Sequence, residues 1–177
     1  MGILNVTPDS FHDGGRYLTA GVALARTREM VDAGACIIDI GGESTRPGAG
    51  KVSVDEELER VLPVIEAVVS GTDILISIDT SKAAVAREAL KAGARMVNDI
   101  TALHGDDGMA AVVASAGCPV CLMHMQGEPG NMQNNPRYDD IVTEITAFFE
   151  ERVEWAVAHG ILRENIILDP GIGFGKK

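Results

Sequence analysis

The sequence predicts an α/β protein built on a parallel sheet, because short apolar runs and helical patterns alternate along its length. The apolar runs carry no alternating polar positions, which is typical of strands that are buried on both faces. A polar group follows or ends each run, and these groups are Asn5, Asp39, Asp79, Asn98 with Asp99, His124 and Asp169. In parallel α/β folds the ligand binds at the carboxyl ends of the strands, and a barrel gathers these ends around one point.

Six runs are expected to be strands: residues 2–6, 35–38, 74–79, 95–99, 119–123 and 166–169. Five stretches between them are expected to be helices: residues 20–33, 53–69, 80–92, 106–116 and 139–159. Ser53 and Glu56 form a capping-box pattern at the start of the second helix. Pro63 implies a kink or a break inside that helix. Thr80 or Ser81 is expected to cap the third helix.

Length and charge limit the possible classes of protein. A chain of 177 residues that is 46% hydrophobic suffices for one domain, and nothing in the sequence divides residues 1–177. A net charge of -11 argues against a nucleic-acid binder, which would show a basic face. No apolar run approaches the roughly 20 residues that a membrane span needs. With no secretory signal pattern, we expect a soluble cytoplasmic protein.

The spacing of Cys118, Cys121 and His124 raises the question of a redox pair or a zinc site. Residues three apart on a strand point to opposite faces, so these side chains should not converge. No second pair of ligands occurs elsewhere in the sequence. We therefore expect two small buried thiols, and an odd count of three cysteines suits a reducing compartment.

The strand-end residues suit a flat heterocycle that carries both donors and acceptors. A carboxylate accepts two parallel N–H bonds, and an asparagine adds one donor and one acceptor. Phe174 or Met123 could cover a face of the ring. At the other end of the ligand, Asn5 and the loop that carries Arg46 would face an anion and a divalent cation. A neutral oxygen ligand such as Asn5 suits Mg²⁺ that is held mostly by water and phosphate.

Two further sequence patterns are explained without a functional site. The glycine-rich end of the chain does not match a phosphate-binding loop, because Pro170 and Lys177 stand at the wrong positions. An apolar stripe on the last helix is expected to pack against the sheet, and it comprises Phe148, Phe149, Val153, Trp155 and Val157.

Six motifs follow one another along the chain: MGILNVTPDSF at residues 1–11, DIGGESTRPG at 39–48, SIDT at 77–80, VNDI at 97–100, MHMQG at 123–127 and DPGIGFGK at 169–176. Through these motifs the sequence closely resembles the dihydropteroate synthase family. The resemblance implies a (β/α)8 TIM barrel of the pterin-binding type, with about six strands present in this chain. It also implies condensation of 6-hydroxymethyl-7,8-dihydropterin diphosphate with 4-aminobenzoate in folate biosynthesis, assisted by Mg²⁺. Family members are sulfonamide targets and are expected to be homodimers.

The resemblance assigns roles motif by motif. Asp79, Asn98 and Asp169 would read the pterin, and Asp79 would also stabilise charge during the reaction. Ile3, Met123 and Phe174 would line the pterin. The diphosphate end would be held by Asn5, which also holds the metal, and by Thr45. The loops 7–15 and 44–50 would close over the site, where the aminobenzoate pocket is shaped by Phe11, Arg46 and Pro47.

The sequence also departs from the family pattern. It stops after the sixth strand, so the family's later Ser-Arg-Lys and Arg-x-His motifs have no counterpart here. Two alternatives therefore stay open: a pterin-binding fragment without turnover, and the pterin domain of a corrinoid-dependent methyltransferase. The loops 7–15 and 44–50 favour the synthase over the methyltransferase.

Overall fold

A computed structural model describes residues 1–7, 16–44, 50, 52–127 and 130–176. Its six described strands form one parallel sheet in chain order. They are β1 (Gly2–Asn5), β2 (Ile37–Gly41), β3 (Leu75–Asp79), β4 (Met96–Asp99), β5 (Val120–Met123) and β6 (Ile166–Asp169). The expected alternation of strand and helix in a parallel sheet is confirmed.

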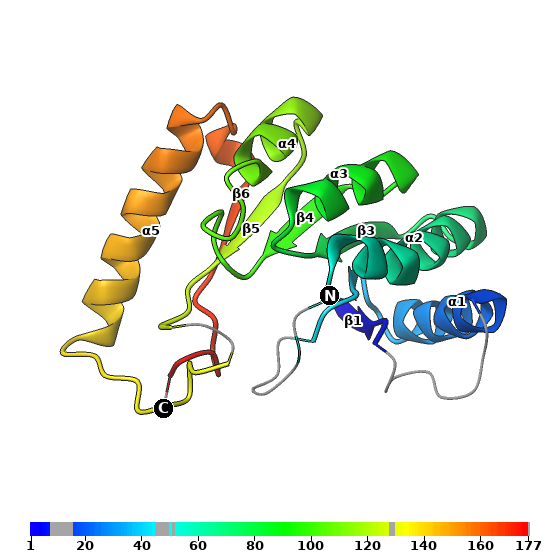
Figure 1. The fold of residues 1–177 in the computed structure, drawn as a ribbon, viewed down its shortest axis with the longest axis horizontal. Coiled ribbons are helices and arrows are strands. Elements are labelled where there is room, and N and C mark those ends of the chain that lie inside the picture. Colours follow the sequence, from blue (N-terminus) through cyan, green and yellow to red (C-terminus); the bar gives the residue numbers. More distant parts are fainter. Residues whose placement is uncertain (8–15, 45–49, 51, 128–129, 177) are drawn as a thin grey trace.

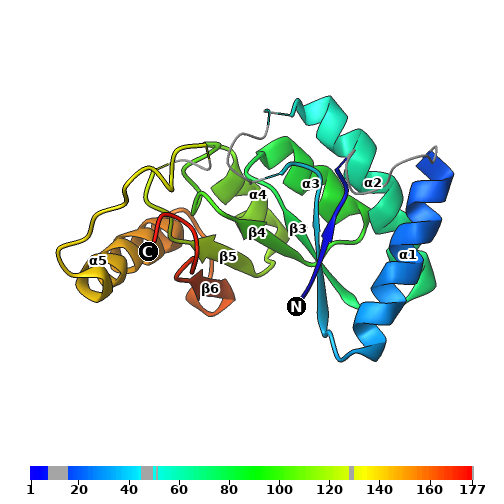
Figure 2. The same cartoon turned by 90° about the horizontal axis from the view of Figure 1, so that it is seen from below.

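Helices follow the strands and cover one face of the sheet (Figures 1 and 2). They are α1 (Arg16–Asp32), α2 (Val54–Gly71), α3 (Ala83–Ala92), α4 (Met109–Ala116) and α5 (Ile141–Ala158), with a short 3-10 turn η2 (Arg163–Asn165) before β6. Helices α1 to α4 pack side by side in chain order. We call the face that they cover the outer face and the opposite one the inner face.

The outer face contains the apolar core, and the strand pleat explains which residues reach it. Alternate strand residues point to the same side, so Ile38 and Ile40 of β2 lie beside Ile76 and Ile78 of β3 under the helices, all at most 1% exposed. From α2, Val61, Val64, Ile65 and Val68 complete this layer. Each fully buried side chain of this size contributes about 1.5–3 kcal/mol.

Two sequence-based boundaries need correction, and the structure also decides whether Pro63 breaks its helix. Strand β2 continues through Gly41 instead of ending at residue 38, because Ile40 and Gly41 pair with Ile78 and Asp79 of β3. Helix α1 begins at Arg16, four residues before the expected start. Helix α2 runs through Pro63 without a break, and the buried Val64 and Ile65 that follow it hold that part of the helix against the core.

The start of α3 also differs from expectation. Its N-cap is Lys82, which makes no side-chain capping bond, so neither Thr80 nor Ser81 is the cap. The Ala83 amide instead donates to Asp106 Oδ2 at 2.9 Å, so the cap comes from the loop before α4. Asp106 is thereby outside the helix that was expected to begin there. By contrast, the Ser53 hydroxyl accepts from the Glu56 amide at 3.2 Å, so its capping role is confirmed.

The remaining expectations concern side-chain environment. Cys118 and Cys121 are buried free thiols, and Cys36 is an exposed one. On α5, Phe148 and Trp155 pack against the core, whereas Val157 is exposed. The buried stripe of α5 also includes Arg152, which donates to the Ala102 carbonyl at 2.9 Å and was not anticipated. Among the described residues, no helix combines the length and apolarity that a membrane span requires.

Candidate active site

One continuous row of paired residues crosses the inner face of all six strands. In order from β1 to β6, the row comprises Asn5, Gly41, Asp79, Asn98, Cys121 and Ile167. Because residues paired across neighbouring strands point to the same side, their side chains lie in one layer. The row therefore brings Asn5, Asp79 and Asn98 together near the carboxyl ends of their strands.

A second polar layer lies one pleat below this row, where Asp39 and Ser77 pair across β2 and β3. The Asn98 amide crosses β3 and donates to Asp39 Oδ2 at 2.8 Å. Both side chains of the lower layer are buried, and Asp39 Oδ1 and Ser77 Oγ lack a hydrogen-bond partner within the described part of the chain. Buried polar atoms are normally satisfied, so this layer is suited to receive an additional polar group.

Acidic groups on both sides of the sheet influence the carboxylates of the inner face. Burial, and after it the negative charges of Asp39, Glu57, Asp99 and Glu43, raise the pKa of Asp79 to about 8. Burial also raises the pKa of Asp39, and nearby Ser77 and Asn98 offset this rise only in part. The Ser77 hydroxyl lies near Asp39 but forms no well-aligned hydrogen bond with its carboxylate. Asp79 therefore holds a proton at neutral pH in the ligand-free protein. Such shifts are common at functional sites.

The Cys121 thiol lies within the influence of the same acids. Burial, and after it the charges of Asp169, Asp39 and Asp79, raise the pKa of Cys121 to about 12. The negative charge of Asp99 adds to this effect. A thiol that stays protonated is a poor nucleophile, so Cys121 contributes a small apolar surface to the row.

Gly41 of β2 leaves room for the side chain of Asp79 on the neighbouring strand. A Cβ atom at position 41 would lie 3.2 Å from Asp79 Oδ2 and 3.3 Å from its Cβ. Any larger residue would push the Asp79 carboxylate away from its place in the row. The first glycine of the Asp-Ile-Gly-Gly motif therefore leaves room for a side chain of the neighbouring strand β3, which the sequence alone did not reveal.

At the far end of the face, Asp169 pairs with Met123 across β5 and β6. Asp169 Oδ1 accepts from the Gly171 amide at 2.8 Å, which leaves Oδ2 as its less engaged oxygen. Gly171 has φ +64, and a Cβ there would lie 2.2 Å from the His124 carbonyl oxygen, so only glycine fits. Lys176 Nζ donates to the carbonyls of His124, Gly171 and Phe174 at 2.9–3.0 Å, which holds the turn after β6 in place.

Two other polar strand-end residues, Asp99 and His124, lie outside the row on the inner face. The Asp99 carboxylate is fully buried on the outer side and accepts from the Thr101 amide, the Thr101 hydroxyl and the Leu103 amide at 2.7–3.0 Å. His124 is buried with its ring edge-on to Phe148, at 4.9 Å between centroids. The Asp99 carboxylate thus organises the loop after β4, whereas His124 Nδ1 lacks a hydrogen-bond partner among the described residues.

The structure places the remaining predicted residues as follows. Ile3 is 68% exposed and Asn5 is exposed, both on the inner face of β1. Met123 is buried, and Phe174 is half-buried in the turn after β6. Four predicted contacts lie outside the described residues, namely Phe11, Thr45, Arg46 and Pro47.

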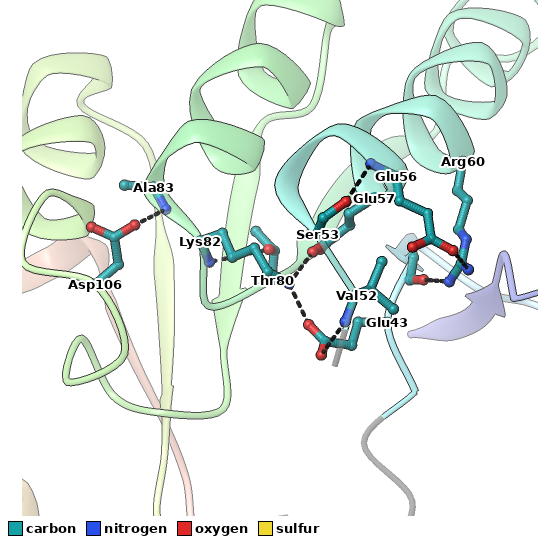
Figure 3. Close-up of polar contacts among 11 residues, drawn as sticks. Glu43, Val52, Ser53, Glu56, Glu57, Arg60, Thr80, Lys82, Ala83 and Asp106 are labelled. Atoms are coloured by element: carbon teal, nitrogen blue, oxygen red, sulfur yellow. Dashed lines mark hydrogen bonds and ion pairs between the residues drawn. The ribbon is translucent and has the colours of Figure 1, made fainter. Parts of the chain in front are cut away.

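Sequence reasoning named Asp39 as a strand end but did not assign it to the site. Its signal was available in the pleat, since Asp39 stands two residues before Gly41 and therefore on the same face. Ser77 stands in the same relation to Asp79. The contacts of Lys82 with Glu43 and Glu57 (Figure 3) were also not predicted, because nothing in the spacing links residues 25 and 39 positions apart.

A metal site must be judged from the donors present. Among the described residues, no three His, Cys, Asp or Glu side chains gather as a metal cage would require. Asn5 offers one neutral oxygen at the open end of β1. This donor set fits Mg²⁺ that takes most of its ligands from water and a bound diphosphate, and it does not fit a metal enclosed by protein.

Known proteins are similar to this chain in sequence and in fold. Residues 1–177 match the family described as pterin binding enzyme. The dihydropteroate synthase of Escherichia coli K12 is 52% identical over 176 residues, which are 99% of this chain and 62% of that protein. The Yersinia pestis dihydropteroate synthase, solved with a sulfonamide drug complex, superposes with a TM-score of 0.92 at 55% identity, over 100% of this chain and 64% of its own.

The Xanthomonas albilineans dihydropteroate synthase, solved with 4-aminobenzoic acid, has a TM-score of 0.90 at 49% identity, over 100% of this chain and 62% of its own. This chain thus spans less than two thirds of the length of these relatives. The likeness confirms the predicted fold, in which about six strands of a TIM barrel are present. Since the family match covers every residue, the chain belongs to the pterin binding enzyme family.

Proposed function

We propose that the protein containing this chain is a dihydropteroate synthase that condenses 6-hydroxymethyl-7,8-dihydropterin diphosphate with 4-aminobenzoate in the cytoplasm. The observation that carries the proposal is the row of Asn5, Asp79 and Asn98 above the buried Asp39, in a chain about half identical to dihydropteroate synthases. The polar groups of this row match a ring with donors and acceptors on its edge.

In this proposal the inner face binds the pterin. Asn98 already donates to Asp39, so its amide oxygen remains for a donor of the ring. Asp169 receives the aminopyrimidine edge through the oxygen that the Gly171 amide does not engage. Met123 and Phe174 line the ring, and Ile3 covers the β1 side. Rigid strands hold the polar groups, which favours accurate orientation.

Asp79 has the electrostatic role. The reaction removes diphosphate from the pterin methylene, so positive charge develops on that carbon before the amine attacks it. A carboxyl group with a pKa of about 8 is close to its ionisation point at neutral pH, so a nearby cation favours its charged form. When positive charge develops on the pterin methylene, Asp79 therefore becomes ionised and stabilises that charge. Asn5 would hold Mg²⁺ together with the diphosphate, and the metal would neutralise charge on the leaving group.

The corresponding assay uses the full-length protein that contains residues 1–177. It should form 7,8-dihydropteroate and diphosphate in equal amounts from the two substrates. The Asp169→Asn variant keeps the size of the side chain but presents a donor to a donor, so pterin affinity should fall by about 2–4 kcal/mol in calorimetry. Unchanged pterin binding in this variant would remove Asp169 from the site.

The metal assignment has its own measurement. Mg²⁺ should tighten binding of the pterin diphosphate and leave the diphosphate-free pterin nearly unaffected, because the metal is shared with the diphosphate. Asn5→Ala should abolish most of this difference. Equal effects of Mg²⁺ on both ligands would contradict the assignment to the diphosphate end.

The two alternatives make different predictions. If the protein only binds pterin, the full-length protein would bind pterin but would form no 7,8-dihydropteroate. A methyltransferase domain would bind a methylated folate and would not distinguish 4-aminobenzoate from other anilines. The relatives reported above are dihydropteroate synthases, which supports the synthase over both.

A further inference from the structure

The glycine-rich turn after β6 ends in a lysine that binds the backbone of its own turn. Lys176 Nζ donates to the carbonyl oxygens of His124, Gly171 and Phe174 at 3.0, 3.0 and 2.9 Å. An ammonium group has three donors, so these three acceptors engage all of them. Within the described part of the chain, Lys176 forms no ion pair with a carboxylate. We call the three carbonyls the ammonium cage.

The glycines of this turn let its backbone close around the ammonium group. Gly171 and Gly175 have φ of +64 and +61, a region that other residues rarely adopt. The turn also lies against the backbone that follows β5 (Figure 1), since a Cβ at position 175 would lie 2.7 Å from the Gln126 carbonyl oxygen. The glycine pattern and its lysine are thus explained by contacts inside the protein, without a bound phosphate.

The cage is connected to both residues of this turn that the proposed pterin site uses. The amide of Gly171 donates to Asp169 Oδ1 at 2.8 Å, and the amide of His124 donates to the Asp169 carbonyl at 2.9 Å. Phe174 supplies the third cage carbonyl, and its amide donates to the Gly171 carbonyl at 2.9 Å. One ammonium group therefore links the side chain of Asp169 to the backbone that carries Phe174.

The charge of Lys176 also acts on this end of the sheet. Burial lowers the pKa of Lys176, and the negative charge of Asp169 opposes that decrease. The cage carbonyls point the negative ends of their dipoles at the ammonium group, which stabilises the charge where water is partly excluded. Asp169 Oδ2 thus stays available for a ligand while a cation lies nearby.

We propose that Lys176 is a positioning residue, whose ammonium group fixes Asp169 and Phe174 relative to each other and so sets the affinity for pterin. This inference rests on the proposed function, because it assigns both residues to the pterin. Without the ammonium group, three carbonyl oxygens would face one another and lose their shared donor, so the turn would open. Asp79 and Asn98 lie on paired strands, and their places do not depend on Lys176.

The decisive test is chemical rescue of Lys176→Ala in the full-length protein. The dissociation constant of diphosphate-free pterin should rise by about tenfold or more in calorimetry, because small misplacements in a site are costly. Propylammonium has the atoms that the substitution removes, so adding it should restore most of the affinity. Tetramethylammonium carries the charge without an N–H donor and should not. A loss that propylammonium fails to repair, or that tetramethylammonium repairs equally well, would overturn the inference.

A second variant separates the shape of the group from its charge. Lys176→Arg keeps the charge, but a planar guanidinium directs its donors in a fork and does not match three convergent carbonyls. Pterin affinity should therefore stay low in this variant, and parental affinity would show that charge alone suffices. The matched control is Lys91→Ala, because Lys91 pairs with Glu88 on an exposed surface. That variant should bind pterin as the parent does.

A third readout does not depend on pterin. Hydrogen exchange of the Gly171 amide should accelerate in Lys176→Ala and slow again when propylammonium is added, because the turn opens without the ammonium group. A parent protein that binds no pterin would contradict the proposed function, whereas this exchange would still report on the cage. Unchanged exchange at Gly171 would count against the positioning role itself.

The unmutated protein supplies a test that does not require the variants to fold. Reductive methylation should modify Lys91, whose side chain is 65% exposed, much faster than Lys176, whose donors are engaged. Bound pterin should slow methylation of Lys176 further, because coupling between two sites is reciprocal. Equal rates for the two lysines, or a Lys176 rate that pterin does not change, would refute the proposal.

Discussion

Two neighbouring residues of β4, on opposite faces of the sheet, use their polar groups in different ways. Asp99 on the outer face receives three hydrogen bonds from its own loop, whereas Asn98 on the inner face donates across β3 to Asp39. On the inner face, Asp39 Oδ1 and Ser77 Oγ have no partner among the described residues. The Asp99 carboxylate is thus satisfied within its own loop, whereas the inner layer retains polar atoms that are suited to receive an additional polar group.

The largest expected effect concerns the inner face of the 177-residue polypeptide made on its own. β1 and β6 are the outermost strands of the described sheet, and apolar residues are exposed on or near them, with Ile3 at 68%, Ile167 at 43% and Ile172 at 88%. Open edges of this kind pair with other chains. We expect self-association in light scattering and no measurable synthase activity.

This expectation has a direct control. Fusing the remaining part of the Escherichia coli relative after Lys177 should give a dispersed, active protein. The cationic motifs that this part is expected to supply would stabilise the departing diphosphate, and one such group is commonly worth about 10²–10³ in rate. A monodisperse 177-residue monomer that turns over both substrates would show that the inner face is complete without them.

The second effect separates the two faces through the neighbours Asp99 and Asn98. Asp99 holds a turn in which Ala102 and Leu103 adopt φ of 50 and 67, a region unfavourable for these residues. Asp99→Ala should therefore lower stability by about 3 kcal/mol, or about 6–12 °C in Tm. Pterin affinity of the folded protein should persist. Asn98→Ala should show the reverse, with weaker pterin binding and a smaller loss of Tm, and equal losses of Tm would contradict the contrast.

The fold could be predicted because apolar runs report burial directly. Residues such as Ile76 and Ile78 mark a strand under helices whatever the ligand is. The end of β2 was misplaced, because Asp39 and Gly41 are poor strand formers in isolation. Pairing of Gly41 with Asp79 extends the strand despite them, and pairing depends on a segment 38 residues away in the sequence.

The site was predictable in part for a related reason. Strand ends identify which residues come near a ligand, but the pleat decides which of two neighbours faces it, as Asn98 and Asp99 show. Hydrogen bonds across a strand, such as that between Asn98 and Asp39, have no periodicity in the sequence. The ion pairs of Lys82 are of the same kind, since only the packed structure brings their partners together.

The third effect tests how closely the inner face is fitted. Gly41→Ala places a methyl group 3.2 Å from Asp79 Oδ2, so the carboxylate must move. Pterin affinity should fall about tenfold in calorimetry, the size of a modest overpacking effect. Gly21→Ala is the control, because no atom lies within 4 Å of a Cβ there and it lies in α1. That change should leave affinity intact and add about 0.5–1 kcal/mol of stability.

The smallest effect is the pH dependence that Asp79 imposes on stability. Burial, and then Asp39, Glu57, Asp99 and Glu43, raise its pKa from 3.8 to about 8 in the folded protein. Between these two values the folded state holds a proton that the unfolded chain has lost. This contribution to stability is complete below pH 3.8 and declines as the pH rises, until it is lost as the pH passes through about 8.

Asp79→Asn removes this titration, because an amide cannot ionise. Its Tm should exceed that of the parent at pH 8.5 by at least about 2–4 °C, the equivalent of about 1 kcal/mol for a protein of this size. The difference should shrink steadily as the pH is lowered to 5, when both are measured by calorimetry in the full-length protein without ligand. Parallel Tm curves would mean that Asp79 is ionised throughout, and they would remove the proposed reason for its response to a developing positive charge.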